Sequence, residues 1–101
     1  MKDIPLGEVI AHRELEFTCE HGEKQTVQVH VGQPVQDGSG PWLCPYRIEG
    51  SSFQKQFRMV GEDSMQALSL TMKTIRVELE VLAKDKKGSF TWFGGTDLGF
   101  T

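Results

Sequence analysis

The stretch that decides the fold is residues 63–86, which read DSMQALSLTMKTIRVELEVLAKDK. Apolar side chains recur in it at spacings of three and four residues, so one face of an α-helix carries a continuous apolar stripe. The stripe consists of Met65, Leu68, Met72, Ile75, Leu79 and Leu82, widened by Leu70, Val77 and Val81. Asp63 with Gln66 three positions later is a capping-box arrangement, and Gly88 after a run of lysines is a stop signal. We therefore predict one helix over residues 63–86.

The residues before this helix alternate between apolar and polar side chains, which is the period of a β-strand with one buried face. Four strands are predicted, over residues 9–19, 24–32, 42–49 and 52–60. Residues 33–41 are dense in Gly, Pro, Asp and Ser and are predicted to form a loop. Pro45 has no N–H for a ladder bond, so the third strand should be an edge there or carry a bulge.

The parity of the apolar residues constrains two hairpins, because directly opposite residues share a face of the sheet. The first two strands both have odd-numbered apolar sets, so the hairpin needs a loop of odd length or a bulge. A three-residue loop places Phe17 opposite Val27. The next hairpin tolerates a two-residue loop at Gly50-Ser51, which places Ile48 opposite Phe53.

Together these elements predict an α+β domain spanning residues 1–101, with a four-stranded antiparallel sheet followed by one long helix packed on one face. The default strand order is a meander. The apolar set of the fourth strand (Phe53, Phe57 and Met59) should face the helix, and the opposite face should be polar. The tail, residues 89–101, is short, aromatic and glycine-rich, and is predicted to fold back against the body. Its aromatic residues Phe90, Trp92 and Phe93 are candidates for one short strand, and the sequence leaves open whether that strand forms.

Charge and composition exclude several classes of protein. The 11 Lys and Arg against 14 Asp and Glu give a net charge of -3, which excludes a broadly basic nucleic-acid binder. No apolar run approaches the ~20 residues that span a bilayer, and Met1 to Pro5 do not resemble a secretion leader. We therefore predict a cytoplasmic protein with no nucleic-acid or membrane partner. Cys19 and Cys44 are then expected to be free thiols.

Histidines and carboxylates on the polar face offer a site with two interpretations. The predicted register puts His30 opposite Glu14, near His12 and Glu16. This cluster would be either a weak metal or acid–base site or a solvated cross-strand ion pair. The second interpretation is favoured because no ligand spacing is diagnostic, so no catalytic residue, metal or cofactor is predicted.

Four other residues are candidates for binding. The guanidinium of Arg47 suits a carboxylate or phosphate, although Glu49 is an alternative partner. Trp92 and Asp97 belong to the glycine-rich tail, which has the composition of a ligand loop but no following helix to hold an anion. Asp63 is most simply a helix cap. A pocket between tail and sheet, near Arg47, Trp92 and Asp97, is therefore one hypothesis.

Three segments carry a resemblance to a known family. They read WLCPYRIEG (residues 42–50), GEDSMQAL (61–68) and WFGGTDLGF (92–100). Together they resemble a family of small bacterial proteins that is known mainly as a domain of unknown function. The resemblance implies a bacterial cytoplasmic protein of about this length and assigns no catalytic residue. It adds weight to Arg47, Asp63, Trp92 and Asp97 as positions to test.

Three functional hypotheses follow. The leading one is a non-enzymatic binding or interaction protein, for instance an immunity or regulatory protein whose acidic charge suits a basic partner. The alternative is a small-molecule-binding protein or enzyme that uses the pocket near Arg47, Trp92 and Asp97. A third hypothesis is a homodimer built through an edge strand or the helix.

Overall fold

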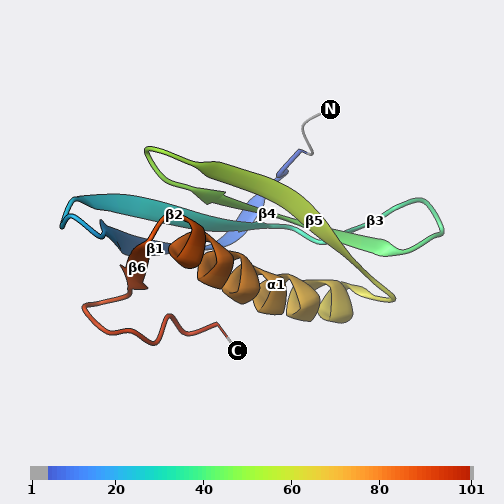
Figure 1. The fold of residues 1–101 in the computed structure, drawn as a ribbon. Helices are drawn as coiled ribbons and strands as arrows, with labels where there is room; N and C mark the ends of the chain where they lie inside the picture. The colour runs from blue at the N-terminus through green and yellow to red at the C-terminus, as the bar shows by residue number, and fades with distance from the viewer. Residues whose placement is uncertain (1–4, 101) are drawn as a thin grey trace.

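The computed structural model describes residues 5–100, which form one antiparallel sheet with a single helix across one face (Figure 1). The elements are β1 (Val9–Cys19), β2 (Lys24–Gly32), β3 (Val35–Gln36), β4 (Trp42–Glu49), β5 (Gln54–Gly61), α1 (Ser64–Asp85) and β6 (Gly88–Thr91). Residues 1–4, where no secretion leader is predicted, and Thr101 lie outside the described range. The predicted α+β class, antiparallel sheet and single helix are confirmed.

The sheet has more strands than the four predicted. Neighbouring strands follow the order β5-β4-β2-β1-β6, so the long strands keep the predicted meander. The short β3 lies inside the predicted loop of residues 33–41 and pairs with Trp42 and Leu43 of β4. The tail adds β6, which pairs with the end of β1. Pro45 lies between the ladders that β4 forms with β2 and with β3, so β4 is locally unpaired on that side. This agrees with the absence of a backbone N–H in proline.

Both predicted hairpin registers are wrong by two residues, whereas the predicted faces are right because a shift of two keeps parity. In the first hairpin, Phe17 pairs with Gln25 instead of Val27. The three-residue loop is residues 20–22, since this places Gly22, with φ of 89°, at the left-handed position that closes such loops. The predicted loop would have put Glu23 at that position.

The second hairpin turns at residues 51–52, one position later than predicted. Gly50 N–H donates to the Phe53 carbonyl at 2.9 Å, and Ile48 consequently pairs with Lys55. The side-chain oxygen of Gln25, from β2, accepts hydrogen bonds from the Ser51 backbone and hydroxyl at 2.8 and 3.1 Å. A contact with a strand that is distant in the sequence therefore fixes this turn. The sequence of the hairpin alone gives no sign of this contact.

The start of the helix agrees with its predicted signal, whereas at its end Lys87, and not the predicted Gly88, takes the left-handed position. The Asp63 carboxylate accepts the backbone N–H of Gln66 at 2.7 Å, and the Gln66 side-chain oxygen accepts the N–H of Glu62 at 2.6 Å. These two bonds satisfy donors that the first turn leaves unpaired. At the other end the Lys86 N–H donates to the Leu82 carbonyl at 2.9 Å, and Lys87 adopts a positive φ of 53°.

The buried face of α1 is rotated relative to the predicted stripe. Its fully buried residues are Ala67, Thr71, Ile75 and Leu79, whereas Leu68, Met72 and Leu82 are only partly buried. Met65, predicted to be inward, is 79% exposed. The reason is the close approach of Ala67 to Gly61, where an added Cβ would lie 2.4 Å from the Ala67 nitrogen. This contact turns the first helical turn so that Met65 faces solvent.

The fourth predicted strand also departs from expectation at one aromatic residue. Phe53 is partly buried, but Phe57 is 47% exposed. Phe57 pairs with the buried Tyr46 and therefore lies on the inner face, meaning the face that packs against α1. Its exposure arises because β5 is an edge strand, paired only with β4 among the described residues.

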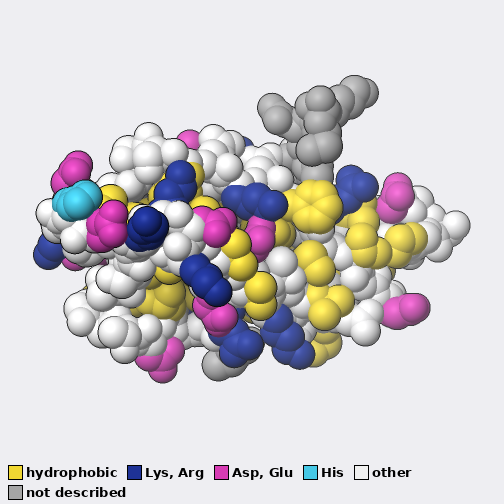
Figure 2. All heavy atoms as spheres, viewed as in Figure 1, with side chains coloured by type: hydrophobic (Ala, Val, Ile, Leu, Met, Phe, Trp, Pro, Cys, Tyr) yellow, Lys and Arg dark blue, Asp and Glu magenta, His cyan; other side chains and the backbone are white. Residues whose placement is uncertain are grey.

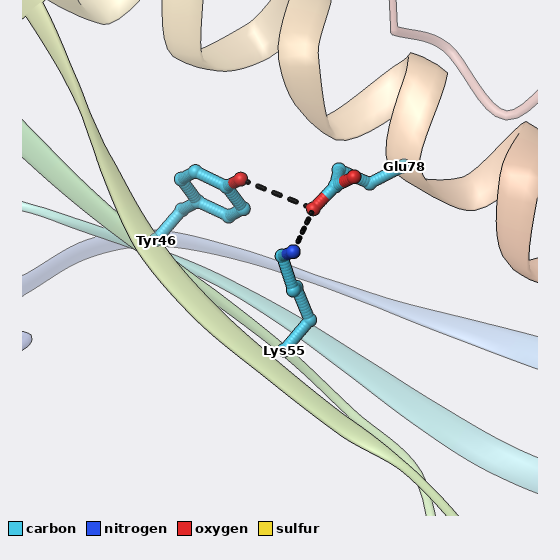
Figure 3. Close-up of polar contacts among 3 residues, drawn as sticks. All are labelled: Tyr46, Lys55 and Glu78. Atoms are coloured by element: carbon cyan, nitrogen blue, oxygen red, sulfur yellow. Dashed lines mark hydrogen bonds and ion pairs between the residues drawn. The ribbon is translucent and has the colours of Figure 1, made fainter. Parts of the chain in front are cut away.

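One polar cluster fixes α1 over β4 and β5 (Figure 3). The Tyr46 hydroxyl donates to Glu78 Oε2 at 3.3 Å, and Lys55 Nζ lies 3.3 Å from the same oxygen. Burial, with the nearby Glu78 carboxylate as a second cause, raises the pKa of the Tyr46 phenol well above its usual value. Tyr46 therefore remains a hydrogen-bond donor at physiological pH, and the cluster joins one helix to two strands.

Candidate functional site

The candidate site is the edge of β1 that faces away from β2. Strand β1 has 11 residues, but β6 pairs only with Glu16 to Cys19. Among residues 5–100, no strand pairs with residues 9–15 on the side away from β2. Backbone N–H and C=O groups on such an edge are free to pair with another chain. The edge of β1 is therefore a ready template for an added strand.

Arg13 holds the C-terminal tail beside this edge. Its guanidinium lies 3.8 Å from the centre of the Trp92 ring and 5.0 Å from that of Phe100. Its Nη1 also donates to the Leu98 carbonyl at 2.8 Å. Cation–π contacts of this kind stabilise by about 0.5–2 kcal/mol each. The part of the tail after β6 is thus fixed on the inner side of β1, where Phe100 is buried, and only β6 itself forms a ladder with β1.

A tight turn places an aromatic side chain in solvent next to the same edge. Trp92 and Gly95 exchange two backbone hydrogen bonds of 2.9 Å, with Phe93 and Gly94 between them at φ of 51° and 79°. This is a two-residue turn with positive φ at both central positions, which glycine and asparagine normally occupy. Phe93 is nevertheless 95% exposed and left-handed. A residue held in two unfavourable states points to a role outside folding.

The unpaired edge and this turn border one hollow. Its volume is about 660 Å³, and its walls come from residues 12–16 of β1, Thr26 of β2 and residues 92–94. Trp92 and Phe93 supply an aromatic side. Glu14 and Glu16 lie on the outer face of the sheet, which does not pack against α1, and Glu16 is 3.6 Å from the Lys24 ammonium. The hollow is continuous with the strand edge, so an extended peptide would fit it better than a compact ligand.

The four residues selected from the sequence do not form one pocket. Trp92 lines the hollow, and Asp97 lies in the same tail, where its carboxylate accepts the Gly99 N–H at 2.9 Å. Arg47 lies on the outer face, where its Nε donates to the Gln56 side-chain oxygen at 2.5 Å. Trp92 packs against the core of the inner face, so Arg47 and Trp92 are on opposite sides of the sheet. Asp63 caps α1.

The predicted pairing of His30 with Glu14 is wrong, because the hairpin register is shifted by two. His30 lies between His12 and Arg47 in one cross-strand row, with 5.9 Å between the two imidazole centres. Glu14 instead accepts a hydrogen bond from the Gln28 amide at 3.0 Å. No group of three or more His, Cys, Asp or Glu within the described chain is arranged to hold a metal ion.

The position of His30 in this row leads us to expect that the stability of the fold depends on pH. Burial, followed by the charges of His12 and Arg47, lowers the pKa of His30, and Glu49 only partly opposes this effect. The unfolded state therefore binds a proton more readily than the folded state, so stability should fall as the pH drops below about 6.5. We expect the free energy of unfolding of His30→Gln to change less between pH 7.5 and about pH 5.5 than that of the wild type.

Urea denaturation at the two pH values measures this difference. His21→Gln is the matched control, because the His21 side chain is 80% exposed on the first hairpin loop. It should retain the wild-type pH dependence. A His30→Gln variant that loses as much stability on acidification as the wild type would contradict the assignment to His30.

Comparison with known proteins places the chain in a family. A family model described as a domain of unknown function, DUF6968, matches residues 11–101. The chain belongs to this family. The match to DUF6968 contains every residue that lines the hollow, and it confirms the predicted resemblance to a domain of unknown function. No curated protein and no solved structure matches the chain. Among the residues that the structure describes, no helix has both the length and the apolar character to cross a membrane.

Proposed function

We propose that this DUF6968 protein is a non-enzymatic binding protein that adds an extended segment of a partner protein to the edge of β1. The observation that carries the proposal is the edge of β1 away from β2, which no strand within residues 5–100 pairs along residues 9–15 and which the exposed Phe93 borders. Addition of a strand to an open edge is a common mode of peptide recognition, in which backbone hydrogen bonds provide affinity and side-chain contacts provide specificity.

The surroundings of the edge define the chemistry of the segment. Side chains of an added strand alternate between the two faces of the sheet. Those on the outer face would approach Glu14 and Glu16, while those on the inner face would approach Trp92 and Phe93. The best segment therefore alternates basic and apolar residues. The net charge of -3 favours the same kind of partner, and an inhibitor or regulator of a basic protein is the biological form that fits it.

Peptides selected from a random decapeptide display library on the full chain provide the test. We expect the selected peptides to bind Phe93→Asn at least about tenfold more weakly than the wild type, because Phe93 supplies an aromatic anchor of the kind that dominates interfaces. Asparagine tolerates the left-handed backbone, so this variant should fold normally. Isothermal calorimetry measures the affinities, and backbone amide NMR shifts locate the bound peptide.

The matched control is Met65→Asn, which removes another highly exposed apolar side chain, at the start of α1. It should bind the peptides as the wild type does. The amide shifts should cluster at residues 9–15 and 92–95. Peptides that bind Phe93→Asn with unchanged affinity, or that shift amides elsewhere in the sheet, would refute the proposal.

A further inference from the structure

We propose that the opposite edge of the sheet, β5, pairs with β5 of a second copy of the chain about a twofold axis at Phe57. This interface is separate from the β1 edge, because β5 and β6 lie at the two ends of the strand order. Among residues 5–100, β5 pairs with β4 alone, so no strand of this range lies along its outer edge.

Apolar side chains border this edge. Phe57, Val77 and Val81 are each about half exposed, at 47%, 49% and 48%. Figure 2 shows apolar side chains gathered along β5 and the neighbouring part of α1, between charged groups. A contiguous apolar area that is rimmed by charges is the usual mark of a contact surface, whereas single exposed apolar residues are ordinary.

The sequence of β5 suits pairing with itself. In the dimer, the inner faces of the two sheets must lie on the same side, so directly opposite residues of the two β5 strands must have the same parity. The twofold axis must then pass through a residue and not between two residues. An axis at Phe57 sets that ring against its symmetry mate, Lys55 against Met59, and Gln56 against Arg58. No like charges are then opposed. An axis at Arg58 would set two guanidinium groups against each other, which is destabilising.

The position of α1 indicates that the partner of the β5 edge is a second copy of the chain and not an unrelated strand. The helix lies over β4 and β5, since Glu78 contacts both Tyr46 and Lys55. Strands are spaced about 4.8 Å apart, so two such helices related through the β5 edge would have axes about 10 Å apart. Packed helices lie 8–10 Å apart. The flanks that carry Val77 and Val81 would therefore meet, and an added strand without its own helix would leave them exposed.

Lys55 does not block this pairing. Charged residues that point inward on an edge strand commonly prevent association. Here the Lys55 ammonium is already paired with the Glu78 carboxylate at 3.3 Å, so its charge is locally neutralised. In the proposed pair it faces the thioether side chain of Met59, which brings no second positive charge.

Sedimentation equilibrium of the full chain across the micromolar range tests the proposal. We expect a monomer–dimer equilibrium whose dissociation constant rises at least tenfold in Phe57→Glu, because two carboxylates would meet at the axis. Val35→Glu is the matched control, since Val35 is 50% exposed on β3, away from the β5 edge. It should dimerise as the wild type does, and circular dichroism checks that both variants are folded.

A second variant tests the register without depending on the charged substitution. In a Cys19→Ser background, Phe57→Cys places two thiols directly opposite each other, at a Cα separation of about 4.5–5.5 Å that a disulfide spans. Mild oxidation should give a covalent dimer, whereas Arg58→Cys in the same background should remain largely uncrosslinked. A wild-type chain that is monomeric at 100 micromolar, or a dimer unaffected by Phe57→Glu, would overturn the proposal.

Discussion

Replacing Phe17 by alanine is expected to lower the free energy of unfolding by about 3–5 kcal/mol, the usual cost of removing a buried phenylalanine ring. Phe17 is 1% exposed and contacts two other aromatic residues. Its ring meets Phe53 edge to face at 6.0 Å between centroids and packs on Phe90 at 4.8 Å. The ring therefore joins β1, β6 and the turn before β5. Chemical denaturation monitored by circular dichroism measures the loss.

Two other variants test whether the loss of stability comes from the lost side-chain volume at this buried position. Phe17→Leu keeps most of the side-chain volume and should cost less than about 1.5 kcal/mol. Phe93→Ala removes the same ring from a side chain that is 95% exposed, so it should leave the stability within about 0.5 kcal/mol. If Phe17→Ala were as stable as Phe93→Ala, Phe17 would not be the centre of this core.

Period and parity in the sequence were sufficient to predict the long strands, the helix and the residues on each face of the sheet, although not the buried face of α1. They were insufficient for register, because a shift of two residues leaves every face unchanged. The register of the first hairpin depends on placing Gly22 at the left-handed position of the loop. The preference of glycine for that position is a property of the local sequence. The second depends on Gln25, whose side chain reaches Ser51 from another strand. Only the first was therefore accessible from the sequence.

The candidate site was less accessible than the fold. Trp92, a candidate from the sequence, lines the hollow, but its partner Arg13 lies at the other end of the chain. Arg13 interrupts the apolar face of β1, and such a charge within a buried set is the signal that a tail or ligand must pair with it. The length of free edge depends on where β6 ends, and the glycine-rich tail gives no periodicity from which to predict that point.

The rotation of α1 leads to the second large effect. Gly61→Ala is expected to lower the free energy of unfolding by about 3 kcal/mol, the upper end of the usual cost of overpacking. The added Cβ would lie 2.4 Å from the nitrogen and 2.8 Å from the Cα of Ala67. Both are backbone atoms of the first helical turn, so no side-chain rotation relieves the clash. Urea denaturation of the variant and the wild type measures the change.

Gly95→Ala is the matched control, since the same methyl group there would meet nothing closer than the Trp92 carbonyl oxygen at 3.6 Å. Neither glycine has a positive φ, so the backbone tolerates alanine at both positions and contact alone distinguishes them. The control should keep or slightly gain stability, because alanine restricts the unfolded chain. Equal effects at the two positions would mean that α1 does not need its close approach to β5. In that case the exposed position of Met65 would require another cause.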